Sequence, residues 1–147
     1  MPSTHLTSNF HFVFSTKERR RLIADDWRPR LHAYLGGIVK GMDAVPLAVG
    51  GVVDHVHLLV SLKSKHRLDY FLRDLKADSS GWIYREFTRL FEWQKGYGGF
   101  SICQREIADV RKYIENQEEH HRRETFENEY VRLLKEYKVD YDAQYLW

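Results

Sequence analysis

The feature that most constrains this chain is the stretch from Gly50 to Ser61, in which an apolar run is interrupted by two histidines. Its valines, leucines and alternation predict a β-strand. Side chains at i and i+2 of a strand point to the same face, so His55 and His57 are expected side by side, with Val56 between them facing the other way. Neutral imidazole is the commonest protein ligand for borderline divalent metals. Two interpretations are open on this pattern alone: a metal site, or a hydrogen-bonded pair of core histidines, which is the commoner case.

The rest of the chain supplies enough elements for one α+β domain over residues 1–147. Strands are predicted at 9–15, 44–50, 52–62 and 96–103, and helices at 25–41, 68–90, 106–121 and 126–138. Gly50-Gly51 is predicted to form the tight connection of a hairpin between the second and third strands. The order predicts a ferredoxin-like split βαβ sandwich, followed by C-terminal helices and an aromatic tail within residues 122–147. The helices are expected to cover one face of the antiparallel sheet and to leave the other face open to a flat or grooved ligand.

Composition excludes several classes of protein. The net charge is only +2, so an anionic partner must be bound by a local patch rather than by a polycation. The single cysteine, Cys103, excludes an intramolecular disulfide and a cysteine-rich zinc module. The N-terminal residues do not read as a signal peptide, and no apolar run is long enough to span a membrane. We therefore expect a cytoplasmic protein with no membrane partner.

Two basic loops are candidates for binding phosphates. The first follows the strand at 9–15 and the second follows the histidine strand; the helix after the second loop adds two further cations on its polar face. Phe14 and Tyr70, which are near these loops, could stack on unpaired bases, although core packing is expected for each. The candidate DNA-binding residues are Lys17, Arg19, Arg20, Arg21, Lys63, Lys65, Arg67, Arg73 and Lys76.

A second group of residues could act on a phosphodiester. Tyr113 and Gln117 are four residues apart in the predicted helix at 106–121, so they share one helical face. Gln117 could add an amide oxygen to two imidazoles as a third metal ligand, which would place the ion within reach of the Tyr113 hydroxyl. An oxygen donor, two imidazoles and open positions suit Mg²⁺ or Mn²⁺ acting as a Lewis acid. Alone, a Tyr-x-x-x-Gln spacing is more often a core or boundary feature.

Taken together, these stretches resemble the single-tyrosine HUH transposases of the small insertion-sequence type and their REP-associated relatives. The middle residue of the histidine motif, hydrophobic in that family, is Val56 here. The stretches that carry the resemblance are Phe12-Val13-Phe14-Ser15-Thr16-Lys17 with the following arginines, Asp54-His55-Val56-His57-Leu58-Leu59, Leu75-Lys76 with Ser79-Ser80, Gly96-Tyr97-Gly98-Gly99-Phe100, and Tyr113-Ile114-Glu115-Asn116-Gln117 followed by His120-His121.

The resemblance implies a catalytic role for Tyr113 as nucleophile and for His55, His57 and Gln117 as ligands of a divalent metal, Mg²⁺ or Mn²⁺. In this family the tyrosine attacks single-stranded DNA at hairpin ends, leaving a 5′-phosphotyrosine link and a free 3′-hydroxyl, and attack by another 3′-hydroxyl rejoins the strand. The insertion-sequence members are homodimers in which the tyrosine helix of one subunit completes the site of the other. The tail beyond Gln117 is longer than in the minimal version, so tyrosine action within one subunit or between subunits is open.

Two other functions are weighed against this one. A non-catalytic protein that binds DNA hairpins could derive from such an enzyme, and an unrelated metal-dependent hydrolase could use the histidine pair with Asp54. Asp54 is expected to point away from the histidine face, where closing the hairpin turn is at least as plausible a role. His120 and His121 could accept the Tyr113 proton or support the metal ligands, but a plain surface position is expected for them.

Overall fold

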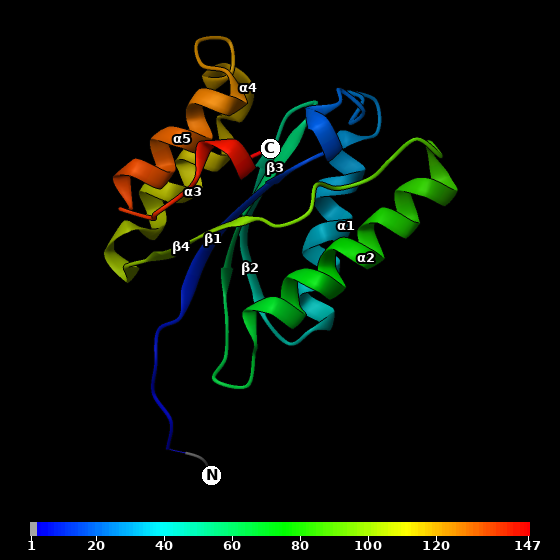
Figure 1. The fold of residues 1–147 in the computed structure, drawn as a ribbon. Coiled ribbons are helices and arrows are strands. Elements are labelled where there is room, and N and C mark those ends of the chain that lie inside the picture. Colours follow the sequence, from blue (N-terminus) through cyan, green and yellow to red (C-terminus); the bar gives the residue numbers. More distant parts are fainter. Residues whose placement is uncertain (1–2) are drawn as a thin grey trace.

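The computed structural model describes residues 3–147 and contains one four-stranded antiparallel sheet of order β2-β3-β1-β4 (Figure 1). The strands are β1 (Asn9–Ser15), β2 (Val45–Gly51), β3 (His55–Ser61) and β4 (Gly98–Ile102). The helices are α1 (Arg28–Gly41), α2 (Leu68–Glu86), α3 (Ile107–Glu115), α4 (Gln117–His120) and α5 (Phe126–Glu136), with short 3-10 turns at Lys17–Arg19, Gln104–Glu106 and Ala143–Tyr145. The expected α+β sandwich with a split βαβ order is confirmed.

Strand β3 lies in the interior of the sheet, between β2 and β1. Its register places His55 opposite Ser15 of β1 and His57 opposite Val13. Because β2 continues through Gly51, which pairs with Val56, the prediction that Gly50-Gly51 forms the connection of this hairpin is wrong. Residues 52–54 make the turn instead, so Asp54 immediately precedes the histidine strand.

One face of the sheet is covered by α1 and α2, as predicted (Figure 1). Val56, Leu58 and Val60 of β3 point to this face and are fully buried in its core. The apolar side chains of the two helices repeat at three- and four-residue steps, which keeps them on one side of each helix. The core residues from these helices are Leu31, Leu35 and Val39 of α1 and Phe71, Leu72, Leu75 and Ile83 of α2.

The other face is not open, because α3, α4 and α5 lie over it (Figure 1). The expectation of a free ligand-binding face is therefore wrong. Val13 and Leu59 point to this second face from the sheet, and α5 packs Tyr130, Leu133 and Leu134 into the same cluster. The C-terminal helix thus completes a three-layer arrangement whose second core surrounds the histidine side of β3.

Local sequence explains how these three helices begin and end. The predicted single helix at 106–121 is broken at Asn116, whose φ of −99° and ψ of 23° separate α3 from α4. Helix α5 begins where the Thr125 hydroxyl accepts a hydrogen bond from the Asn128 backbone N–H, which satisfies one of the free donors at a helix start. Gly50 lets α3 lie close to β2, because a Cβ there would stand 2.2 Å from the Ile114 carbonyl oxygen.

The aromatic tail folds back on the body. The guanidinium of Arg19 lies 4.5 Å from the Trp147 ring centroid, and that ring also contacts Phe126 and Tyr130 at centroid distances of 6.0 and 5.8 Å. Within residues 3–147, none of the helices combines the length and the apolar character needed to cross a membrane.

Candidate active site

The two strand histidines lie on the face covered by α3, α4 and α5, and both side chains are fully buried. Their ring centroids are 5.0 Å apart, so the expected side-by-side arrangement is confirmed. Val56 between them points into the opposite core. The strand therefore fixes two imidazoles at a separation that one ion can bridge.

The Nδ1 atom of each ring has a hydrogen-bond partner that the sequence did not predict for this role. His55 Nδ1 lies 2.7 Å from the Asp54 carboxylate, so Asp54, for which closing the turn was at least as plausible as a functional role, contacts the histidine directly. His57 Nδ1 lies 2.7 Å from Nε2 of His11, a buried histidine of β1. His11 and Val13 are two residues apart in β1, so they lie on the same face of the sheet, and this alternation was visible in the sequence. Hydrogen bonds of this kind orient metal-binding imidazoles in other proteins.

The predicted tyrosine and glutamine come to the same place from α3 and α4. The Gln117 side-chain oxygen lies 3.2 Å from His55 Nε2, and Gln117 is 1% exposed. The Tyr113 ring centroid lies 5.8 Å from that of His57. The structure therefore brings together all four residues predicted for the site: His55, His57, Tyr113 and Gln117.

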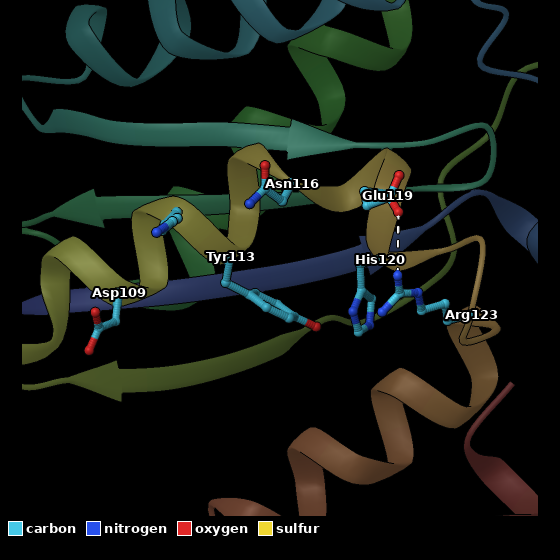
Figure 2. Close-up of a pocket in the computed structure, with 7 residues that line it drawn as sticks. Asp109, Tyr113, Asn116, Glu119, His120 and Arg123 are labelled. Carbon is cyan, nitrogen blue, oxygen red and sulfur yellow. Dashed lines mark ion pairs between the residues drawn. The ribbon is translucent and has the colours of Figure 1, made fainter.

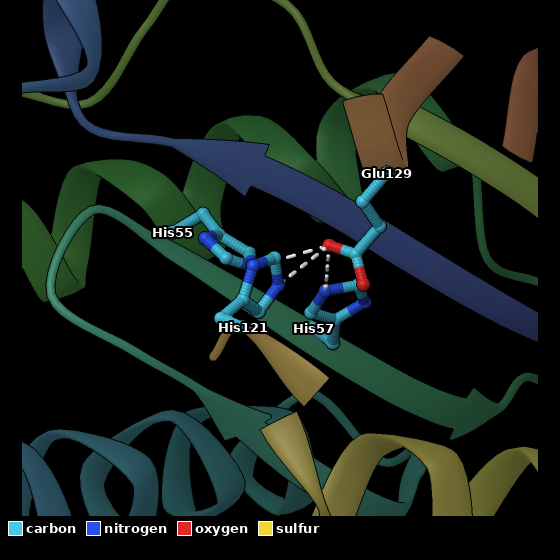
Figure 3. Close-up of side chains that lie close together, drawn as sticks. All are labelled: His55, His57, His121 and Glu129. Carbon is cyan, nitrogen blue, oxygen red and sulfur yellow. Dashed lines mark hydrogen bonds and ion pairs between the residues drawn. The ribbon is translucent and has the colours of Figure 1, made fainter. Parts of the chain in front are cut away.

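Glu129 of α5 stands in the centre of this group and was missed by the sequence analysis (Figure 3). Its Oε1 lies 3.0 Å from His57 Nε2 and 3.3 Å from His55 Nε2, and its Oε2 accepts hydrogen bonds from the Tyr113 hydroxyl and, at 3.2 Å, from the Gln117 amide. Glu129 is fully buried. The sequence did contain an indication of burial. Glu129 follows Phe126 by three residues and precedes Leu133 by four, so its carboxylate occupies the apolar face of the helix.

His121 also belongs to the site, which corrects the expectation of a surface position. Its Nε2 lies 3.0 Å from Glu129 Oε1 and 2.9 Å from the Gln117 side-chain oxygen, and its side chain is 9% exposed. His120 is 26% exposed and lies 3.4 Å from Glu129 Oε2. Donor atoms of His55, His57, His121 and Glu129 all lie within 4.8 Å of one another, so the residues fit a single cation.

Charge and burial set the protonation of these groups. Burial alone would raise the pKa of Glu129, but the surrounding imidazoles, His57 first among them, hold this pKa far below its usual value. Burial lowers the pKa of His57 to about 4. For His55, burial acts in the same direction, yet Asp54 and Glu129 raise its pKa above the usual value. The centre thus holds an ionised carboxylate among imidazoles.

The nucleophile candidate has a second partner on α5. Arg132 donates a hydrogen bond of 3.0 Å from Nη2 to the Tyr113 hydroxyl and is itself paired with Glu124. Burial and the Glu129 carboxylate raise the pKa of Tyr113, whereas Arg132 acts in the opposite direction. Arg132 was not predicted, and its only sequence signal is its position one turn after Glu129.

Pockets open on two sides of the buried cluster. One, of about 390 Å³, has Tyr113 and His120 in its wall beside Asn116 and Arg123 (Figure 2). Another, of about 840 Å³, is bordered by Asp54 and His121. A ligand therefore has room next to the cluster, on the tyrosine side and on the His121 side.

The predicted DNA-binding residues are divided between the two ends of the sheet. The first loop is beside the site, since Thr16 N–H donates to the Asp54 carbonyl at 2.8 Å and Arg21 borders the larger pocket with Asp54. The second loop lies at the other end, because β1 and β3 are antiparallel and a seven-residue strand is about 20 Å long. Arg21 and Lys76 apart, these cations form ion pairs with carboxylates: Lys17 with Glu92, Arg19 with Glu127, Arg20 with Glu18, Lys63 and Lys65 with Asp43, Arg67 with Asp69, and Arg73 with Asp74.

Phe14, Tyr70 and Lys76, which are near these loops or on the following helix, differ in burial and contacts. Phe14 is fully buried in the core, as expected. Tyr70 is 45% exposed, so its expected core position is wrong; Arg67 and Arg73 lie 3.9 and 4.6 Å from its ring centroid. The Lys76 ammonium donates to the carbonyls of Gln94 and Gly96 at 2.7 and 2.6 Å, and burial lowers its pKa to about 8. Lys76 is thus tied to the loop before β4.

Comparison with known proteins decides the family. The family model described as "Transposase IS200 like" matches residues 4–117, which include β1 to β4, Tyr113 and Gln117. The chain belongs to the IS200-like transposase family. The resemblance seen in the sequence is thereby confirmed, and this transposase is a DNA-processing enzyme. The match ends before His121, Glu129 and Arg132.

Individual relatives agree with this assignment. The transposase is 25% identical over 117 residues to the ISDra2 transposase TnpA of Deinococcus radiodurans, covering 74% of this chain and 82% of the relative. It is 26% identical over 121 residues to the transposase of insertion sequence element IS200 from Salmonella typhimurium, covering 78% and 79%.

Two solved structures share the fold. One is a putative transposase from Deinococcus radiodurans R1, with a TM-score of 0.66 and 23% identity over 80% of this chain and 95% of that one. The other is a REP-associated tyrosine transposase bound to a REP hairpin, with a TM-score of 0.56 and 13% identity over 78% of this chain and 68% of that one.

Proposed function

We propose that this transposase cleaves and rejoins single-stranded DNA at hairpin ends through a covalent bond to Tyr113, with a divalent cation at the histidine cluster. The observation that carries the proposal is the contact between the Tyr113 hydroxyl and Glu129, the carboxylate that also contacts His55 and His57. A tyrosine held against an imidazole cluster in a DNA-processing family has the position required of a nucleophile.

The chain's own residues account for the first chemical step. The Tyr113 oxygen attacks the phosphorus while Glu129 accepts the hydrogen bond that orients its hydroxyl, the phenol proton passes to water, and Arg132 stabilises the negative charge that develops on the phenol oxygen. The Tyr–O–P bond forms while the P–O3′ bond breaks, and the departing 3′ oxygen takes up one proton, so bonds, protons and charge balance. The reverse reaction with another 3′-hydroxyl rejoins the strand without water or ATP.

His55, His57 and Gln117 would hold the cation, Mg²⁺ or Mn²⁺, which supplies Lewis-acid polarisation of the phosphodiester. Asp54 and His11 keep the two imidazoles oriented toward it. The scissile phosphate has room in the pocket whose wall includes Tyr113 and His120.

A DNA hairpin is the proposed partner, because a relative of the same fold has a structure with a REP hairpin. We propose that Lys17, Arg19, Arg20 and Arg21 contact phosphates beside the site. Lys63, Lys65, Arg67 and Arg73 would contact the duplex farther away, where the exposed Tyr70 between two arginines offers a stacking surface. Lys76 lies next to Phe14 and Gln94, at the same end of the sheet as the histidines, and would contact DNA there.

A denaturing gel tests the proposal. Protein is incubated with Mn²⁺ or Mg²⁺ and labelled single-stranded DNA carrying the hairpins that flank its gene. A slow-migrating adduct is expected for the wild type and for Tyr84→Phe, an exposed control tyrosine, and no adduct for Tyr113→Phe or His57→Ala.

Other results would favour the alternatives. Cleavage without an adduct and with an active Tyr113→Phe would indicate the hydrolase, and tight hairpin binding without cleavage would indicate the binding protein. The hydrolase is disfavoured by the contact of Asp54 with the Nδ1 side of His55, away from the other imidazoles.

A further inference from the structure

We infer that His121 and Glu129 are ligands of the same cation as His55, His57 and Gln117, and that this imidazole-rich set selects a first-row transition ion over Mg²⁺. The inference rests on the proposed metal-dependent function of this site and adds two ligands and the class of ion. Both residues lie beyond the region matched by the family model, which ends at Gln117.

The hydrogen bonds at Nδ1 of His121 and His55 determine which ring nitrogen carries the hydrogen. His121 Nδ1 lies 2.7 Å from the Glu124 backbone carbonyl, which can only accept, so Nδ1 carries the hydrogen. His55 Nδ1 lies 2.7 Å from the ionised carboxylate of Asp54, which also only accepts. A neutral imidazole has one N–H, and therefore the Nε2 atom of each ring presents a lone pair to the centre.

The atoms facing these two lone pairs are also acceptors. His121 Nε2 lies 2.9 Å from the Gln117 oxygen and 3.0 Å from Glu129 Oε1; His55 Nε2 lies 3.2 and 3.3 Å from the same two atoms. The Gln117 amide nitrogen is directed to Glu129 Oε2 at 3.2 Å, which leaves its oxygen facing the rings.

Four lone-pair atoms at hydrogen-bonding distance repel one another unless positive charge lies among them. One extra proton, on either ring, would leave the lone pair of the other ring facing the same two acceptors, and extra protons on both rings would place two buried imidazolium ions at a centroid distance of 4.5 Å, which is costly. One divalent cation accepts all four lone pairs at once, and the contacts of the rings with Asp54 and Glu124 are those usual behind metal-binding histidines. Figure 3 shows the three histidines converging on Glu129.

The donor set indicates the class of ion. Three imidazoles from His55, His57 and His121, with a carboxylate and an amide oxygen, suit manganese, cobalt or zinc. Mg²⁺ prefers oxygen ligands and retains several waters, for which this buried centre of side-chain donors is poorly suited. Glu129 would then contact the ion with one oxygen and Tyr113 with the other, so that the cation also fixes α5 to the sheet.

The experiment measures metal binding without DNA. The full chain is freed of metal with a chelator and titrated with Co²⁺, followed by visible absorption, and Mn²⁺, Zn²⁺ and Mg²⁺ then compete for the site. We expect the dissociation constant for Co²⁺ to rise at least tenfold in Glu129→Gln and in His121→Asn, with an altered spectrum, and Mg²⁺ to displace little Co²⁺. Two controls, Glu127→Gln on the same helix and His5→Asn, change exposed side chains and should bind like the wild type.

Unaltered affinity and spectrum in both variants, or displacement of Co²⁺ by equimolar Mg²⁺, would overturn the inference. Circular dichroism in chelator identifies variants that fail to fold; for these, Glu129→Asp keeps the charge but shortens the side chain and should still weaken Co²⁺ binding. The thermal midpoint should rise with metal in the wild type and less in Glu129→Gln.

The gel assay on the same samples separates the two proposals. Metal binding that depends on His121 and Glu129, without any DNA adduct, would overturn the proposed function alone. If the Glu129 and His121 variants bind Co²⁺ as tightly as the wild type and the adduct still forms, only the proposed ligand set is overturned.

Discussion

The hydroxyl of Tyr113 has two partners of opposite charge, Glu129 and Arg132, and both come from α5. The carboxylate favours the protonated phenol, whereas the guanidinium favours the phenolate. The reactivity proposed for this tyrosine therefore depends on a helix that begins nine residues after Gln117.

Arg132→Gln should slow formation of the DNA adduct by roughly 10- to 100-fold, because a hydrogen bond to a charged group contributes about 1.5–3 kcal/mol. Arg132→Lys should recover part of the rate, since it retains the charge. The measurement is the initial rate of adduct formation on the denaturing gel. Lys135→Gln, an exposed change on the same helix, is the matched control, and an Arg132→Gln rate equal to that of Lys135→Gln would contradict the assigned role.

His32 on α1 provides a pH-dependent prediction outside the site. Burial and the neighbouring Arg28 lower its pKa to about 4, and its Nε2 is buried without a hydrogen-bond partner. The folded-state pKa is below the usual 6.5, so the unfolded chain binds more protons between about pH 4 and 6.5. The free energy of unfolding should therefore fall as the pH drops through this window, by at most about 1.4 kcal/mol per pH unit for one histidine.

Urea unfolding at several pH values between 4.5 and 7 measures this dependence. His32→Gln should have a shallower slope than the wild type, while His5→Gln, an exposed change near the N-terminus, should retain the full slope. Parallel curves for His32→Gln and the wild type would show that another group binds the protons.

At the scale of elements, the position of α3 depends on a close approach to β2. A Cβ at Gly50 would also lie 2.9 Å from the Ile114 Cγ2 atom, so neither the backbone nor the side chain of α3 leaves room for it. Tyr113 precedes Ile114 directly, so the proposed nucleophile moves whenever this contact moves.

Gly50→Ala should lower the free energy of unfolding by about 1–3 kcal/mol, as other overpacked cores do, and should reduce adduct formation by displacing Tyr113. Gly36→Ala in α1 is the matched control, because nothing lies within 4 Å of its Cβ position; it should raise stability by about 0.5–1 kcal/mol. Denaturant unfolding and the gel assay measure the two effects. A Gly50→Ala protein as stable as the wild type would contradict the packing argument.

At the scale of the whole molecule, one chain contains both the histidines and the tyrosine of the proposed site. The homodimer implied by the family resemblance is still a prediction, which sedimentation velocity tests. Exchange of tyrosine helices within such a dimer would have to withdraw Tyr113 from Glu129 and Arg132.

Mixing two inactive variants distinguishes the arrangements. Tyr113→Phe and His57→Ala are co-refolded in equal amounts and given hairpin DNA and metal. We expect no adduct above background, because every site built within one chain lacks either the tyrosine or a histidine. Recovery of about a quarter of the wild-type adduct, the fraction of sites in which random pairing of exchanging subunits joins intact residues, would show exchange between subunits.

The sequence predicted those residues of the candidate site that follow the periodicity of a single strand or helix. Alternation in β3 identified His55 and His57, and a four-residue helical step identified Tyr113 and Gln117. Glu129 and Arg132 were missed because their role depends on how α5 folds back over the sheet, and His121 was considered as a support of the metal ligands but expected at the surface. The position of Glu129 on an apolar helix face indicated that it is buried, but no local pattern predicted which residues it contacts.

The sequence by itself determined the four strands, the order of strands and helices, and most of the apolar residues that face inward, since these follow from side-chain periodicity. Tertiary structure alone decided that the second face of the sheet is closed, that His11 orients the His57 imidazole, and that the two basic loops lie at opposite ends of the sheet. The physical reason is that these contacts join residues from 46 to 72 positions apart, such as His11 with His57 and His57 with Glu129. Their formation depends on the packing of whole elements rather than on any neighbouring residue.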